Sequence, residues 1–170
     1  MELSKKERLI LCNQYEILKQ LNPDEAEYYE VKQEVVLNGF KYNYDSLIEN
    51  FDDEVPTDIS EFVYDVLQMY RCINHSYHSL LDEDKKEYDK LRTTFEGFDG
   101  NEEPKYYWYA CFLLEKLKLY EESYQNGKIE TNSHCNKIDR YEGMLNRWKE
   151  VRAGKYDTLT FENIRYIVER

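Results

Sequence analysis

The chain has 170 residues, of which 41% are apolar and 15% aromatic, and it carries a net charge of −12 at pH 7. A chain of this length can bury about two-thirds of the surface that its unfolded form exposes, so neither a structural metal nor a disulfide framework is required. The negative charge opposes attraction to phosphate backbones and anionic lipids, so we expect no nucleic-acid or membrane partner.

The first 44 residues indicate two helices and a short turn. Ser4 followed by Glu7 is a capping-box pattern, which starts a helix. The apolar residues on either side of it fall on one helical stripe: Leu3, Ile10, Leu11, Ile17, Leu18 and Leu21. Asn22 and Pro23 restart the chain as a second helix, which we expect Gly39 to end in the C-cap position.

An acidic segment, residues 45–65, contains eight carboxylates and no basic residue. Its middle, residues 51–58, is predicted to be a linker, and Thr57 or Asp58 opens the longest helix. We expect that helix to lie along the core, followed by a charged helix over residues 82–92. Its apolar face comprises Ile59, Phe62, Val63, Val66, Leu67, Tyr70, Ile73, Tyr77 and Leu81.

The stretch FEGFDGNEEP, from Phe95 to Pro104, has two interpretations. It could be an acidic loop that holds a ligand, although its residue order does not match an EF-hand. It could equally be a helix start, in which Asn101 caps the helix and the Glu102 and Glu103 carboxylates complement its positive end. We favour the helix start and leave the binding loop open.

The remaining sequence predicts three more helices. Residues 106–114 are apolar on all sides, which is typical of a buried helix, and a break follows at Asn126 and Gly127. A helix with basic residues then runs to Gly154, and Thr160 caps the last helix. The predicted core side chains of the helix that ends at Gly154 are Ile138, Tyr141, Met144, Leu145 and Trp148.

The charge is distributed unevenly along the chain. Residues 1–125 carry 14 basic and 28 acidic side chains, whereas residues 126–170 carry 9 basic and 7 acidic ones. We therefore expect the tail to dock on the body of the protein or on a neighbouring subunit. No segment alternates as a strand would, so the sequence predicts one compact all-α domain over residues 1–170, with about seven or eight helices and no sheet.

The cysteines and the apolar runs indicate a cytoplasmic protein. The cysteines lie far apart without a C-x-x-C pair, as expected for thiols in a reducing compartment: Cys12, Cys72, Cys111 and Cys135. Charged residues from Lys5 to Arg8 interrupt any export signal. The longest apolar run, residues 106–114, is shorter than the ~18 to 20 residues that a membrane span needs.

One group of side chains could bind a metal. Cys72, His75 and His78 are spaced i, i+3 and i+6, and a zinc site there would need a further ligand such as His134 or Cys135. Side chains at this spacing spread over about 120° of a helix and diverge. We favour solvated or inter-helix roles for these residues and expect no cofactor.

Gln14 is an unexpected polar residue within the apolar stripe of the first helix, where we favour a hydrogen bond to a neighbouring helix over a ligand contact. A buried amide without partners costs about 1 to 3 kcal/mol, so a neighbouring helix or a ligand must satisfy it. One candidate pocket lies between the first helix and the aromatic helix, lined by Gln14, Tyr15 and Tyr109. Phe98 and Asp99 are candidates if the acidic stretch is a binding loop.

Catalytic patterns are missing from the sequence. The chain contains no G-x-S-x-G, H-E-x-x-H, P-loop or G-x-G-x-x-G motif. The aromatic run at residues 106–109 lacks the interleaved Lys and Arg of a nucleic-acid face, so core packing is its expected use.

Several segments together resemble the YfbU family of bacterial proteins across nearly the whole chain. They are RLILCNQY at residues 8–15, QMY at 68–70, FEGFDGNEE with its aromatic helix, YEGMLNRW at 141–148, and the closing helix after Thr158, Leu159 and Thr160. The resemblance implies a compact multihelical, cytoplasmic and self-associating protein, without an established catalytic set. Some relatives carry a helix-turn-helix segment, which implies a sensing or interaction module; here the YfbU-like part uses the whole chain.

Three functional hypotheses follow. The first is a non-enzymatic interaction module that forms a homo-oligomer and binds another protein or a small molecule. The second is a small-molecule-sensing regulatory domain with the pocket at Gln14, Tyr15 and Tyr109. The third is a metal-dependent enzyme, which would need convergent carboxylates or the Cys72, His75 and His78 group in a cleft.

Overall fold

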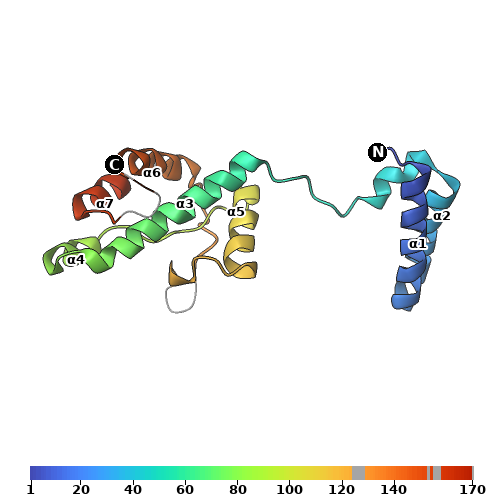
Figure 1. Cartoon of the computed structure of the whole chain (residues 1–170), viewed down its shortest axis with the longest axis horizontal. Coiled ribbons are helices and arrows are strands. Elements are labelled where there is room, and N and C mark those ends of the chain that lie inside the picture. Colours follow the sequence, from blue (N-terminus) through green and yellow to red (C-terminus); the bar gives the residue numbers. More distant parts are fainter. Residues whose placement is uncertain (124–128, 153, 155–157, 170) are drawn as a thin grey trace. The chain divides into compact units, whose positions relative to one another are not determined.

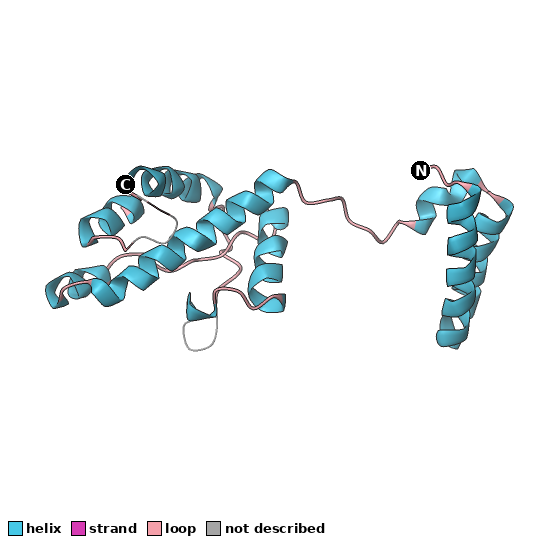
Figure 2. Cartoon of the chain, viewed as in Figure 1, coloured by secondary structure: helices cyan, strands magenta, loops and turns pink. Residues whose placement is uncertain are grey.

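A computed structural model describes residues 1–123, 129–152, 154 and 158–169. These residues form seven α-helices, several short 3-10 helices and no strand, which confirms the predicted all-α fold (Figure 2). Residue contacts divide the chain into two compact units, Met1–Glu54 and Val55–Arg170, here called the N-terminal and C-terminal units. The assignment of residues 1–170 to a single domain stays a prediction.

The N-terminal unit is a hairpin of two helices, α1 (Lys5–Leu21) and α2 (Ala26–Asn38), joined through a 3-10 helix at Pro23–Glu25 (Figure 1). The predicted capping box is present, because Ser4 Oγ accepts from Glu7 N and the Glu7 carboxylate accepts from Ser4 N. Gly39 ends α2 at φ 71°, as predicted. Arg8 of α1 donates to the Val36 and Leu37 carbonyls, at 2.6 and 2.7 Å, and so ties the two helices together.

The core of the N-terminal unit is small. Its buried apolar side chains come from α2 and from a 3-10 helix at Lys41–Leu47: Val35, Val36, Tyr44 and Leu47. The single apolar stripe predicted for α1 is wrong. Leu11 and Leu18 are half-buried, whereas Ile10, Ile17 and Leu21 are exposed, because one side of α1 faces α2 and the opposite side does not.

The C-terminal unit is built around α3 (Thr57–Ser76), the longest helix, as predicted (Figure 1). Short α4 (Asp82–Tyr88) follows it, and α3 contacts both α5 (Pro104–Cys111) and α6 (Ile138–Val151). The charged helix is therefore shorter than the predicted residues 82–92. The face of α3 that enters the core includes Val63, Val66, Leu67, Tyr70 and Ile73.

Complete burial of the aromatic helix was a wrong prediction. Ala110, Leu113 and Leu114 are buried, but Trp108 is 56% and Phe112 47% exposed. One side of α5 packs against α3, and the helix widens into π geometry at Phe112–Lys116. The predicted break at Asn126 and Gly127 lies outside the described residues.

The tail packs on the body of the protein, as one of the two charge-based expectations proposed. Residues of α6 and of α7 (Phe161–Val168) join the same core as α3. Lys149 pairs with Asp65 of α3 at 3.3 Å, and the predicted Thr160 cap accepts from Asn163 N at 3.2 Å. The buried side chains are Tyr141, Met144, Leu145, Trp148, Ile164 and Ile167. Among the described helices, none combines the length and apolar character needed to cross a bilayer.

Candidate functional site

The stretch from Phe95 to Pro104 forms a tight backbone corner against residues 131–133. Phe98 N donates to the Thr131 carbonyl at 3.0 Å, and Ser133 N donates to the Phe98 carbonyl at 3.1 Å, which makes an isolated parallel bridge. Gly97 has φ 84°, and a Cβ there would lie 2.3 Å from the Thr131 carbonyl carbon and oxygen. This contact requires glycine at position 97.

The buried carboxylates of the corner bind backbone N–H groups. Asp99 Oδ1 accepts from Asn101 N at 2.7 Å and Glu102 N at 3.1 Å. Glu103 is 1% exposed. Its Oε2 accepts from Asp99 N at 2.8 Å, while Oε1 accepts from Lys137 N and Ile138 N at 2.7 and 2.8 Å. The Glu103 carboxylate thus caps the N-terminus of α6, where the helix dipole favours negative charge.

The corner is therefore a structural joint between α5 and α6. Glu103 occupies the N-cap position of α5, so the prediction that Asn101 caps this helix is wrong. Asn101 instead lies within the turn that Asp99 closes. The ligand candidates Phe98 and Asp99 are 0% and 5% exposed, and their polar groups serve the fold. Their ligand roles stay predictions. In this geometry neither side chain offers an open surface to a ligand.

Glu96 holds the outer side of the corner through ion pairs with Lys137 and with Arg140, the latter at 2.9 Å. Burial raises the pKa of Glu96, but the hydrogen bonds and charges of these two partners outweigh it and keep the pKa below its ordinary 4.5. The Tyr141 hydroxyl donates to the Gly97 carbonyl at 3.0 Å and accepts from Glu96 N at 3.2 Å. Burial raises the pKa of Tyr141, which keeps this donor protonated.

Glu96 predicts a pH dependence of stability. A carboxylate with a depressed folded-state pKa stabilises the fold above its unfolded pKa, and this contribution is lost as pH falls through the folded pKa. We expect Glu96→Gln to lower the free energy of unfolding at about pH 7, with a difference from wild type that shrinks below about pH 4.5. Urea titrations across this pH range measure the difference in the free energy of unfolding. Glu83→Gln, at an exposed site of α4, is the control, and a pH-independent loss in Glu96→Gln would contradict the assignment.

The three residues expected to share a ligand pocket lie in different units. Gln14 is exposed, so its predicted burial is wrong for the chain by itself. Tyr15 is half-buried against the small N-terminal core, where burial raises its pKa. Tyr109 lies in the C-terminal unit, edge-on to Tyr64 with ring centroids 6.0 Å apart. A pocket shared by these residues stays a prediction.

The exposed side of α1 carries several large apolar side chains. Ile10, Ile17 and Leu21 are 54%, 58% and 70% exposed, and with Gln14 they form the surface here called the α1 face. None of the 17 residues of α1, all of them described, is buried. Beside α2 lies a cleft of about 1000 Å³, the α2 cleft. Its lining includes the apolar side chains of Tyr28, Val31 and Val35, one cation, Lys32, and four carboxylates, Asp24, Glu25, Glu27 and Glu49.

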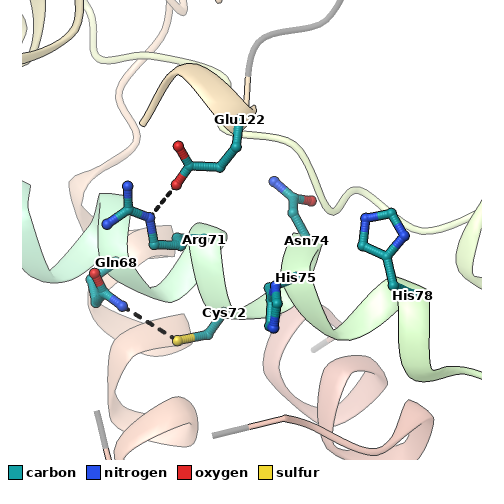
Figure 3. A pocket seen from close by; sticks show the side chains of 7 residues that line it. All are labelled: Gln68, Arg71, Cys72, Asn74, His75, His78 and Glu122. Carbon is teal, nitrogen blue, oxygen red and sulfur yellow. Dashed lines mark hydrogen bonds and ion pairs between the residues drawn. The ribbon is translucent and has the colours of Figure 1, made fainter. Parts of the chain in front are cut away.

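A smaller cavity of about 270 Å³, the α3 pocket, lies in the C-terminal unit (Figure 3). It contains all three proposed zinc ligands. However, the described part of the chain holds no group of three His, Cys, Asp or Glu side chains that could bind a metal ion. The described lining comprises Gln68, Arg71, Cys72, Asn74, His75, His78 and Glu122.

Sequence reasoning missed four of these lining residues: Gln68, Arg71, Asn74 and Glu122. The spacing of positions 71, 74, 75 and 78 is i, i+3, i+4 and i+7, which places four nitrogen-bearing side chains on one side of α3 and the turn after it. That pattern is visible in the sequence. Glu122 comes from a distant segment, and sequence spacing gives no sign of it.

Comparison with known proteins covers both units. The sequence model described as "YfbU domain" matches residues 1–170. A UPF0304 protein from Methanocaldococcus jannaschii is 35% identical over 157 residues, which span 91% of this chain and 92% of that protein. These matches confirm the resemblance inferred from the separate sequence segments, and the chain belongs to the YfbU family.

Proposed function

We propose that the protein is an interaction module that self-associates through its N-terminal unit, with the α1 face of one copy packed in the α2 cleft of a second copy. The observation that carries this proposal is the exposure of Ile10, Ile17 and Leu21 on a helix that buries none of its residues. Contiguous apolar surface of this kind is typical of protein interfaces.

The spacing of the α1 face supports a helix as its partner. Ile10, Gln14, Ile17 and Leu21 follow one another at intervals of four, three and four residues, which is the seam of helices packed side by side. Gln14 is the polar residue within this seam. A single polar residue at such a position fixes the register of the partners at some cost in stability.

Charge supports a second copy of the chain as that partner. The α2 helix carries one basic and three acidic side chains. Of the four basic side chains of α1, Arg8 and Lys19 bind groups of their own chain, which leaves Lys5 and Lys6 for the acidic α2 of a second copy. Packing α1 of each copy against α2 of the other joins opposite charges twice, in the self-complementary manner of a two-fold dimer. The core of the N-terminal unit contains four buried apolar residues, and packing against a second copy would enlarge it.

Charge insertion into the α1 face tests the proposal. We expect wild type to be a dimer or higher oligomer at micromolar concentration, and Ile17→Glu to weaken association by about a hundredfold or more, because a carboxylate would be desolvated in the seam. Native mass spectrometry and light scattering measure the mass. Leu81→Glu is the matched control, since Leu81 is a 73% exposed aliphatic residue of the C-terminal unit.

Two outcomes would overturn the assignment. One is a wild-type protein that remains monomeric at these concentrations. The other is an Ile17→Glu variant that keeps the wild-type mass. Gln14→Leu gives a further check on register, because an apolar residue at this position should strengthen association while allowing more than one oligomeric mass.

A further inference from the structure

The α3 pocket concentrates nitrogen donors on one side of a helix. Arg71, Asn74 and His75 lie on α3, and His78 lies on the 3-10 helix directly after it, Tyr77–Ser79 (Figure 3). The chain contains 35 acidic side chains, yet Glu122 is the one carboxylate in the described lining of this cavity. This composition is the reverse of the acidic α2 cleft.

Two contacts hold Arg71 in place. Its Nε donates to Glu122 Oε1, and its guanidinium lies over the Tyr120 ring, 4.2 Å from the ring centroid. Because the ion pair uses Nε, the terminal nitrogens of the guanidinium remain as donors toward a ligand. A planar fork of N–H groups matches the oxygens of a carboxylate or phosphate group.

Asn74 is oriented by a neighbouring side chain. Its Oδ1 accepts from the Tyr88 hydroxyl at 3.0 Å, which leaves the amide NH₂ as its further hydrogen-bonding group. The His75 and His78 rings are exposed, and within the described residues neither ring has a hydrogen-bond partner. Each imidazole can donate an N–H, and each gains charge attraction to an anion when protonated.

We propose that the α3 pocket binds a small organic oxyanion, through the Arg71 fork, the Asn74 amide and the two imidazoles. The ligand carries a carboxylate or a phosphate ester, and a cavity of about 270 Å³ holds a molecule at the small end of metabolite size. Glu122 competes with this ligand for Arg71. The inference concerns the C-terminal unit and stands independently of the association of α1.

The chain supplies its own internal control for a binding experiment. It has three histidines, and His134 lies outside the pocket lining. Proton NMR resolves one imidazole C2–H resonance for each, assigned with His75→Gln, His78→Gln and His134→Gln. We expect phenyl phosphate or benzoate, added at constant pH and ionic strength, to shift the His75 and His78 resonances in a saturable manner. The His134 resonance should stay in place.

Variants that change the charge of the pocket identify the sign of the ligand's charge. Arg71→Gln should weaken binding about tenfold or more, because it removes the charged donors. Glu122→Gln should strengthen it several-fold, because it removes the competitor for Arg71. Circular dichroism establishes whether both variants fold, and His75→Gln, at an exposed site, replaces Arg71→Gln if that variant does not.

The probes separate the sources of the oxyanion. Saturation by phenyl phosphate assigns a phosphate ester, and saturation by benzoate assigns a carboxylate; inorganic phosphate measures what the anion contributes without an organic group. Equal shifts at all three histidines, or no saturable shift at millimolar concentrations, would overturn the proposal. So would zinc-induced shifts of His75 and His78 that Glu122→Gln weakens, since they would identify a cation site.

Discussion

Replacing Glu103 by alanine should destabilise the C-terminal unit by about 3 kcal/mol or more. The Glu103 carboxylate accepts from Lys137 N and Ile138 N with one oxygen and from Asp99 N with the other. Hydrogen bonds to a charged group contribute about 1.5 to 3 kcal/mol each, and removing the acceptor leaves buried N–H groups without a partner. The lost hydrogen bonds lie in the first turn of α6 and in the corner before α5, so the variant would destabilise both regions.

Urea unfolding measures this loss, and two further variants define its cause. Glu103→Gln keeps one carbonyl oxygen but turns an NH₂ group toward backbone donors, so we expect an intermediate destabilisation. Glu102→Ala is the matched control, because the Glu102 side chain is exposed. A Glu103→Ala variant as stable as Glu102→Ala would mean that solvent replaces the carboxylate without cost, contrary to the capping role.

Gly97→Ala should be comparably damaging, with a loss of about 3 kcal/mol or more or a failure to fold. Two costs combine: a side chain at φ 84° is strained, and the new Cβ would lie 2.3 Å from the Thr131 carbonyl. The atoms it meets belong to backbone. Relief of the clash would therefore break the bridge between Phe98 and Asn132.

We expect Gly143→Ala to have the opposite effect on stability. Gly143 lies inside α6, and the nearest atom to an added Cβ is Arg147 Nη1, at 3.4 Å on a flexible side chain. Alanine in a helix interior is favoured over glycine by about 0.5 to 1 kcal/mol, so this variant should be more stable than wild type. Thermal and urea unfolding compare the stabilities of Gly97→Ala and Gly143→Ala with that of wild type. Similar stability of both variants would contradict the requirement for glycine at position 97.

Local sequence chemistry predicted the features that depend on neighbouring residues. The capping box of Ser4 and Glu7, the C-cap at Gly39 and the cap at Thr160 each act within one turn of helix. Most of the apolar face of α3 also followed from spacing, because a helix fixes which side chains share a side. Leu81 was wrongly assigned to this face, since α3 ends at Ser76 and Leu81 is 73% exposed. These parts of the fold were accessible without coordinates.

The errors arose where a residue acts over a long distance in sequence. Glu103 caps a helix that begins more than thirty residues later, whereas the local sequence pattern favours Asn101 as a cap. The Gln14 prediction failed for a related reason: a helical wheel gives the side chains that share a face, but not which face a partner covers. In the α3 pocket, spacing could have grouped Arg71 with Asn74, His75 and His78, whereas Glu122 is brought there by the fold.

Hydrogen bonds between segments far apart in the sequence affect how fast the C-terminal unit folds. Helical proteins usually fold rapidly because most of their contacts are local. Here Leu159 N donates to Ser76 Oγ across 83 residues of sequence, and Tyr141 reaches the Gly97 carbonyl across 44. Large loops must close before such contacts can form, and their closure entropy opposes the transition state. The unit should thus fold at the slower pace of mixed topologies, although its secondary structure is helical.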